Sequence, residues 1–221
     1  MVIVKNLEKV RETVKNCARD VVMIAATKTQ TKETIDEFAS LAPEFVLGEN
    51  RVQELVAKYD ERYVWHFIGR LQTNKVKYII DKVALIHSLD RLELATEIEK
   101  QATKHDKVQD CLVEINMGSE ISKGGIEPDK LLEFVDSLKD FKHLCILGIM
   151  SVLPNLEDKT ELRKLYANLQ QLFEQLKTLR QDNLEVKYLS AGMTNDYEIA
   201  LEYGSNMIRL GRVLFGERNA I

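Results

Sequence analysis

The chain has 221 residues, which is the length of one large domain or two small ones. With 45% hydrophobic and 30% charged residues, 10 Gly and 3 Pro, the composition excludes a disordered or collagen-like chain. Lys plus Arg number 31 against 35 for Asp plus Glu, and a net charge of −4 does not favour nucleic acid as a partner.

Targeting segments and metal motifs are not evident. The amino terminus lacks the apolar region of a signal peptide, and no apolar run approaches about 18 residues. We therefore expect a cytoplasmic protein without a membrane partner. The three cysteines are far apart and odd in number, and the four histidines lack a ligand spacing such as HxxxH. We expect neither disulfides nor a metal site, and His66 and His87 are expected to be core or rim residues.

The predicted elements follow a regular order. An amphipathic helix precedes Val21, and eight short apolar runs then alternate with segments of helical period. The runs are rich in β-branched or aromatic residues and end in small polar residues, which is typical of buried strands. They span residues 21–28, 45–50, 63–69, 84–90, 111–116, 144–152, 186–192 and 207–215.

Eight successive strand-then-helix units predict a parallel sheet covered by helices, and eight is the number that closes a barrel. We expect an α/β fold: a single (β/α)8 TIM-type barrel with an extra N-terminal helix, forming one domain over residues 1–221. A doubly wound open sheet is the alternative. Leucines from Leu162 to Leu179 recur at steps of three and four. We expect this helix face to cover the barrel rather than form a dimer seam, and we expect a monomer.

Helix starts are predicted directly after three strands. Asn50 with Gln53, Asp90 with Glu93, and Asn195 with Glu198 each resemble a capping box.

Lys28 ends the first predicted strand, at the face of a barrel that carries the active site. A lysine that is partly desolvated near other cations has a lowered amine pKa, which makes it a nucleophile toward an aldehyde. The alternative is an ordinary solvated lysine at a strand end.

A candidate phosphate site follows the seventh and eighth strands. LSAGMTNDYE (189–198) offers a glycine, Gly192, and the hydroxyls of Ser190 and Thr194, and RLGR (209–212) places a glycine between two arginines. Barrels often bind phosphate in these two loops. The alternative is a glycine-containing turn with surface arginines. A lysine and a phosphate site together suit a ligand with an aldehyde and a phosphate, and pyridoxal 5′-phosphate (PLP) fits that description.

Six stretches in order resemble the YggS/PROSC family of pyridoxal phosphate homeostasis proteins. They are AATKTQT (25–31), LGENRVQE (47–54), WHFIGRLQTNK (65–75), INMGSEISKGG (115–125), GIMSV (148–152) and LSAGMTNDYEIALEYGSNMIRLGRVLFG (189–216). The resemblance covers nearly the whole chain. It implies a barrel like the N-terminal domain of alanine racemase, PLP held as an internal aldimine, a role in vitamin B6 and amino-acid homeostasis, and no enzymatic activity.

The resemblance also implies roles around the cofactor ring. Lys28 would form the Schiff base, and Arg209 would face the pyridine nitrogen. Asn50 would lie beside the ring, with helix capping as its competing role. Lys123 is a weaker candidate for a second, transient aldehyde contact, and an ordinary loop lysine is the favoured interpretation.

A phosphate cup is implied between the last two loops. One side consists of Ser190, Gly192, Met193 and Thr194. The backbone N–H groups of Gly211 and Arg212 form the other side.

The expected partners and the alternative functions are as follows. PLP is the expected small-molecule partner, with PLP-dependent apo-enzymes as recipients. A PLP-dependent amino-acid racemase is the alternative function, but such enzymes need a second base from an additional domain and a partner subunit. The chain ends six residues after Phe215, so we expect a binder that lacks catalytic residues. A phosphosugar-type barrel enzyme is a third class.

Overall fold

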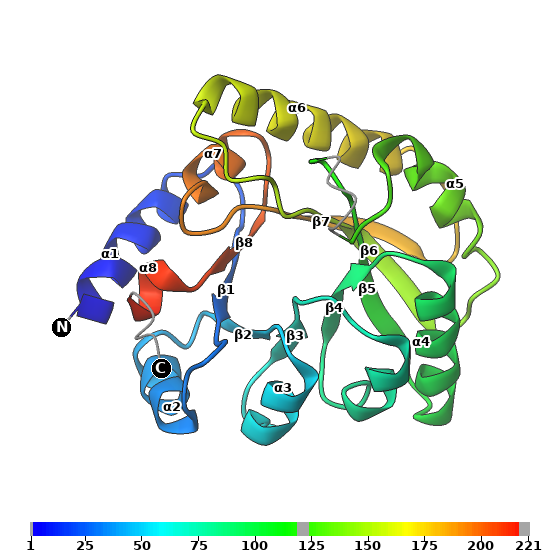
Figure 1. The fold of residues 1–221 in the computed structure, drawn as a ribbon, viewed down its shortest axis with the longest axis horizontal. Helices are drawn as coiled ribbons and strands as arrows, with labels where there is room; N and C mark the ends of the chain where they lie inside the picture. Colours follow the sequence, from blue (N-terminus) through cyan, green and yellow to red (C-terminus); the bar gives the residue numbers. More distant parts are fainter. Residues whose placement is uncertain (1, 119–123, 217–221) are drawn as a thin grey trace.

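A closed barrel of eight parallel strands, in sequence order, forms the centre of the computed structural model, which describes residues 2–118 and 124–216 (Figure 1). The predicted (β/α)8 barrel is confirmed, and the open sheet is excluded. The strands are β1 Val22–Ala26, β2 Val46–Glu49, β3 Trp65–Phe67, β4 Leu85–Leu89, β5 Gln109–Glu114, β6 Leu144–Met150, β7 Leu184–Ser190 and β8 Met207–Leu210.

Helices surround the barrel and connect the strands. The α-helices are α1 Val2–Lys15, α2 Lys32–Leu41, α3 Val52–Lys58, α4 Leu92–Lys104, α5 Leu131–Asp136, α6 Lys159–Leu176, α7 Tyr197–Glu202 and α8 Arg212–Phe215. Two short 3₁₀ helices, η1 Thr73–Tyr78 and η2 Pro128–Lys130, complete the outer layer. The last predicted run, 207–215, divides at Gly211, where β8 ends and α8 begins.

The three predicted capping boxes are wrong. The residues at the helix N-caps are Arg51, Arg91 and Asp196, and none of them makes a side-chain capping bond. Each helix begins one residue later than the sequence pattern indicates. Side-chain caps occur instead at Thr31, which accepts from the Thr34 N–H, and at Asp158, which accepts from the N–H groups that start α6.

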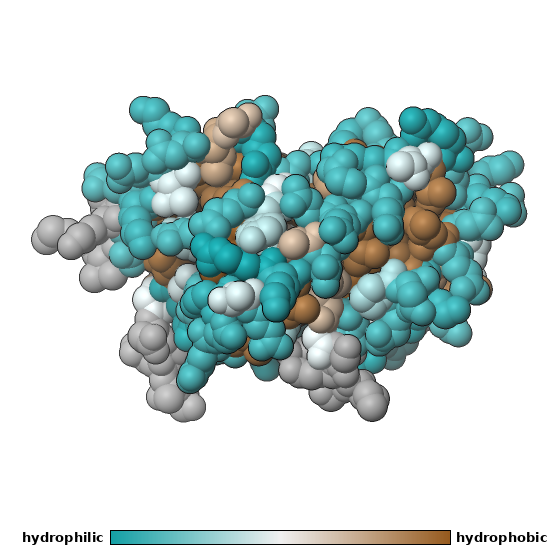
Figure 2. Space-filling model, turned by 90° about the horizontal axis from the view of Figure 1, so that it is seen from above, coloured by the Kyte–Doolittle hydropathy of each residue, from teal (hydrophilic) through white to brown (hydrophobic). Residues whose placement is uncertain are grey.

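The leucine face of α6 packs inward, as predicted. Leu162, Leu169 and Leu176 are buried together with Tyr166 and Phe173. Figure 2 views the molecule from the side on which α6 lies in Figure 1, and that face is mostly hydrophilic, with hydrophobic side chains between polar ones. The apolar side of α6 therefore stabilises the barrel wall.

Two hydrophobic layers hold the barrel together. The larger layer lies between strands and helices, and a smaller cluster fills the barrel interior. The interior cluster contains Ile24, Ile68, Leu85, Leu112, Leu147, Met150 and Met207. Because alternate residues of a strand face the same side, polar residues of the same strands also enter the interior, among them His87 and Arg209, which are buried.

The closure between β7 and β8 has the fewest paired residues in the barrel. Only Ser190 and Met207 are register partners there, whereas β1 and β8 share four pairs. Bonds outside the ladder join the two strands: the Asn206 side chain accepts from the Leu189 N–H at 2.8 Å, and the Arg209 N–H donates to the Gly192 carbonyl at 3.0 Å.

In the described part of the chain, no helix has the length and apolarity needed to cross a membrane.

Candidate functional site

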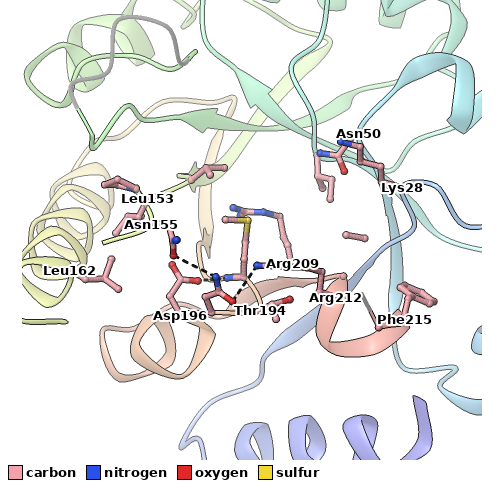
Figure 3. Close-up of a pocket in the computed structure, with 18 of the residues that line it drawn as sticks. Lys28, Asn50, Leu153, Asn155, Leu162, Thr194, Asp196, Arg209, Arg212 and Phe215 are labelled. Carbon is pink, nitrogen blue, oxygen red and sulfur yellow. Dashed lines mark hydrogen bonds between the residues drawn. The ribbon is translucent and has the colours of Figure 1, made fainter. Parts of the chain in front are cut away.

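A cavity of about 610 Å³ opens at the carboxyl ends of the strands. Its walls come from β8 and from the segments that follow β1, β2, β3, β6, β7 and β8. The predicted site residues that line it are Lys28, Asn50, Met193, Thr194, Arg209, Gly211 and Arg212. Figure 3 shows Lys28 and Asn50 on one side, Thr194 and Asp196 on the other, and Arg209 between them. The volume is in the range of small-molecule sites.

Lys28 lies in a tight turn directly after β1. The Gln30 N–H donates to the Thr27 carbonyl at 2.9 Å, and Thr29 has a φ of +68°. A positive φ at the third residue is the geometry of a type II turn, in which Lys28 is the second residue. The turn leaves the Lys28 side chain half-buried at the cavity wall.

A charged network that the sequence analysis did not identify lies behind this turn. Nζ of Lys58 lies 3.1 Å from Oε1 of Glu49 and 2.8 Å from Oε2 of Glu54, and it donates to the Thr27 carbonyl at 3.1 Å. The Thr29 N–H donates to Oε2 of Glu54 at 2.9 Å. The four-residue spacing of Glu54 and Lys58 was the available signal, but it indicates only a helix-surface ion pair.

The two carboxyl groups of this network differ in burial and in pKa. Glu49 is completely buried, and desolvation raises its pKa to about 7 against the opposing charge of Lys58. Partial burial also acts to raise the pKa of Glu54, but hydrogen bonds from Lys58 and the Thr29 N–H outweigh it and lower the value to about 2. Glu54 therefore carries the permanent negative charge.

Arg209 is fixed from inside the barrel. Nη1 donates to the hydroxyl of Ser190 at 2.7 Å and to its carbonyl at 2.9 Å, and Nη2 donates to the Ser151 carbonyl at 2.9 Å. Desolvation lowers the pKa of this buried guanidinium, although a guanidinium stays charged near neutral pH. The cation therefore reaches the cavity with its orientation already set.

A chain of polar groups continues from Ser190 to two histidines. Nδ1 of His87 lies 3.2 Å from the Ser190 hydroxyl oxygen, and its Nε2 lies 3.1 Å from Nδ1 of His66. Burial lowers the pKa of His66 to about 3, and burial, with smaller electrostatic contributions from neighbouring His66 and Arg209, lowers that of His87 well below its usual value. Both rings are neutral at neutral pH, so Arg209 is the cation of this interior chain.

The two predicted phosphate loops both line the cavity. Thr194 accepts from the Val213 N–H at 3.3 Å, and Nη2 of Arg212 donates to the Asn195 side chain at 3.2 Å, so the two loops touch. Within residues 2–118 and 124–216, no acceptor is recorded for the N–H groups of Gly211 and Arg212. These donors suit an anion such as phosphate.

Asp196 adds a negative charge to this wall, but its carboxylate is engaged by other groups. It accepts from the Met193 N–H at 2.7 Å and from the Tyr166 hydroxyl at 2.8 Å. Burial and the neighbouring Asp196 charge raise the pKa of Tyr166, which keeps the hydroxyl protonated as the donor.

Ser190 and Gly192, the other two residues predicted for the phosphate cup, do not line the cavity. Ser190 is beneath Arg209, and Gly192 adopts a φ of +98° against α7, where a Cβ would come within 2.6 Å of the Ala200 Cβ. Asn50 does not cap α3, so its side chain is available to the cavity that it lines. Lys123 lies outside the described residues.

Comparison with known proteins connects this arrangement to a family. Residues 2–219 match the model of the alanine racemase N-terminal domain. The chain is 45% identical over 207 residues to the pyridoxal phosphate homeostasis protein of Aquifex aeolicus, covering 92% of this chain and 88% of that protein. It is 32% identical to the protein of the same name from Pasteurella multocida, covering 99% of both chains.

Solved structures agree with this relationship. PipY of Synechococcus elongatus, solved with PLP bound, superposes with a TM-score of 0.85 at 27% identity, over 97% of this chain and all of PipY. Alanine racemase of Clostridium difficile shares the fold alone, with a TM-score of 0.74 at 17% identity, over 98% of this chain and 57% of the racemase. The chain therefore belongs to the YggS/PROSC family of pyridoxal phosphate homeostasis proteins.

Proposed function

We propose that this protein binds PLP in the cavity as a Schiff base on Lys28 and acts in PLP and amino-acid homeostasis without catalysis. The observation that carries the proposal is the shared cavity of Lys28, the prearranged Arg209 and the open N–H groups of Gly211 and Arg212. The PLP bound to PipY and the names of the homeostasis proteins support it.

The bond to Lys28 is a condensation. Nζ adds to the aldehyde carbon of PLP, the carbonyl oxygen leaves as water, and a C=N bond remains. For the rest of the molecule, Arg209 would donate to the pyridine nitrogen, and the N–H groups of Gly211 and Arg212 would donate to the phosphate; all three residues line the cavity. Asn50 and Met193 line the same cavity and would contact the bound molecule beside these groups.

Arg209 is also the basis for proposing that catalysis is absent. A guanidinium does not release a proton near neutral pH, so it can only donate to the pyridine nitrogen and leaves that atom unprotonated. An unprotonated ring is a weaker electron sink, which disfavours the carbanion chemistry of most PLP enzymes. Held by Ser190 and Ser151, the arginine is not free to move away.

The direct test is borohydride reduction of the loaded protein followed by peptide mass spectrometry. We expect a pyridoxyl adduct on Lys28, and no adduct at that peptide in Lys28→Ala. An unmodified Lys28 in a protein that has been saturated with PLP would contradict the proposal.

Catalysis and delivery need separate measurements. Exchange of the α-proton of L-alanine in deuterated water at enzyme-like rates would instead indicate an amino-acid racemase, the alternative suggested by the shared fold. Transfer of PLP to a PLP-dependent apo-enzyme faster than from free PLP would identify such enzymes as recipients. We also propose a monomeric, cytoplasmic protein, which light scattering and cell fractionation test.

A further inference from the structure

The turn that carries Lys28 contains a residue that does not favour its backbone conformation. Thr29 has a φ of +68°, and β-branched side chains rarely occupy this left-handed region. Position three of a type II turn is usually glycine or asparagine for this reason. A strained residue persists only where surrounding contacts hold it, and such residues gather at functional sites.

The contacts that hold the turn act on both peptide groups of Lys28. The carbonyl of Thr27 belongs to the peptide group before Lys28, and it accepts from Nζ of Lys58 at 3.1 Å. The N–H of Thr29 belongs to the peptide group after Lys28, and it donates to Glu54 at 2.9 Å. The backbone of Lys28 is thus fastened on each side by one end of the same ion pair.

Lys58 is the centre of this arrangement. Its ammonium group has three acceptors, the Thr27 carbonyl, Glu49 and Glu54, which match its three N–H donors, and its side chain is 12% exposed. Glu49 is anchored in turn, because its Oε2 accepts from the Asn50 N–H at 3.2 Å and lies 3.3 Å from the Thr27 hydroxyl, which it shares with the Gly48 carbonyl. A substitution of Lys58 therefore removes the bond to the Thr27 carbonyl and also the ion pairs that hold Glu49 and Glu54 beside the turn.

We propose that Lys58, together with Glu49 and Glu54, is a positioning group that holds the Lys28 turn in the conformation from which the Lys28 amine reaches a bound aldehyde. This inference rests on the proposed Schiff base at Lys28. Lys58 itself contacts neither the phosphate loops nor Arg209, so its effect falls on formation of the covalent bond and not on docking of the phosphate and ring.

Two probes separate these steps. PLP can form the Schiff base, whereas pyridoxine 5′-phosphate, with an alcohol in place of the aldehyde, can only dock. In Lys58→Met we expect the equilibrium constant for Schiff-base formation, followed by absorbance, to fall about tenfold, with little change in the Kd of pyridoxine 5′-phosphate. Lys58→Arg, which retains the charge and the donors, should recover most of the loss.

Lys107→Met is the matched control. Lys107 is also half-buried and donates to backbone carbonyls, those of Ile80 and Val83, but it precedes β5 at the opposite end of the barrel. We expect it to lose stability without altering the Schiff base. If Lys58→Met does not fold, Glu54→Ala serves instead, because it removes the acceptor of the Thr29 N–H and leaves the Glu49–Lys58 pair.

A rescue experiment tests the cause directly. Glycine accepts a positive φ without strain, so Thr29→Gly should restore Schiff-base formation in the Lys58→Met background. Amide hydrogen exchange at Thr29, measured without PLP, should accelerate in Lys58→Met and not in Lys107→Met. A Lys58→Met protein with unchanged Schiff-base formation, or with equal losses for both probes, would overturn the positioning role. A wild-type protein that docks pyridoxine 5′-phosphate but forms no adduct on Lys28 would overturn the proposed function itself.

Discussion

The guanidinium of Arg209 and the hydroxyl of Ser190 form a 2.7 Å hydrogen bond in the barrel interior. The same hydroxyl oxygen lies 3.2 Å from Nδ1 of His87, so it joins the cavity cation to a buried neutral imidazole. Ser190 is completely buried and does not line the cavity. We therefore expect its hydroxyl to act on the site through the arginine and not by direct contact with a phosphate.

Ser190→Ala tests this relationship. Removing one bond to the guanidinium should cost about 1–2 kcal/mol in the free energy of unfolding and let Arg209 tilt. We expect a shifted absorbance band of bound PLP, measured beside denaturant unfolding. Ser205→Ala is the control, because Ser205 is equally buried but its hydroxyl bonds to backbone groups near β7 and β8, including the Ala191 carbonyl at 2.7 Å. An identical spectrum in both variants would count against the role of Ser190.

The pH dependence of stability should report the buried His66. Its pKa is about 3 in the folded protein against 6.5 in the unfolded chain, so the unfolded chain binds more protons between these values and stability falls as the pH falls. In His66→Gln this contribution disappears. The stability difference between wild type and variant should therefore shrink by about 2 kcal/mol from pH 7 to pH 5.

Denaturant unfolding at both pH values measures this difference. Burial raises the pKa values of Glu49 and Glu114 to about 7, and their contributions to the pH dependence of stability have the opposite sign. The comparison with wild type cancels these contributions, because both proteins contain the two residues. A difference that stays constant between the two pH values would show that His66 does not stay neutral in the folded protein.

Gly192→Ala should damage the loop after β7. Its φ of +98° is unfavourable for alanine, and the added Cβ would lie 2.6 Å from Ala200 and 3.0 Å from the Cα of Tyr197. We expect a loss of at least about 2 kcal/mol in the free energy of unfolding together with weaker binding of PLP. Gly118→Ala is the control, since a Cβ there meets Pro154 at 3.5 Å. Equal thermal midpoints for the two variants would refute the steric argument.

Arg212→Ala should weaken the phosphate contact alone. The side chain is exposed and bonded to Asn195, so its charge acts through solvent and we expect about a fivefold rise in the Kd of PLP at low salt. Pyridoxal, which lacks the phosphate, should bind to both proteins alike. Arg163→Ala, which breaks an exposed pair with Glu202, is the control. An equal rise in the Kd of pyridoxal would contradict a role of Arg212 in binding the phosphate.

The barrel could be predicted from the sequence because each strand is a short apolar run with its own end signal. Every predicted run overlaps one observed strand, and only the run at 207–215 contains a further element. Those strand ends also indicated where the cavity lies, since Lys28 and Arg209 line it from opposite ends of the chain.

Contacts between distant segments could not be predicted in the same way. Lys58 looks like an ordinary helix-surface residue until the barrel brings the Thr27 carbonyl to 3.1 Å from it. Asn50 and Asn195 carry capping side chains in sequence, but the barrel places Asn50 and Asn195 on the cavity wall and starts the helices later. Tertiary placement overrides local propensity at these positions.

The sparse pairing of β7 with β8 would give a phosphate bound in the proposed cup a structural role. The two loops of the phosphate cup continue from these strands, so an anion held by both would bridge the place where the ladder has one register pair. A bound cofactor would then help to close the barrel, and free ligand at a hundred times its Kd would add about 2.7 kcal/mol to the free energy of unfolding. Loss of the cofactor would loosen the barrel wall at β7 and β8. The rigidity of this wall would therefore differ between the cofactor-bound and the cofactor-free protein.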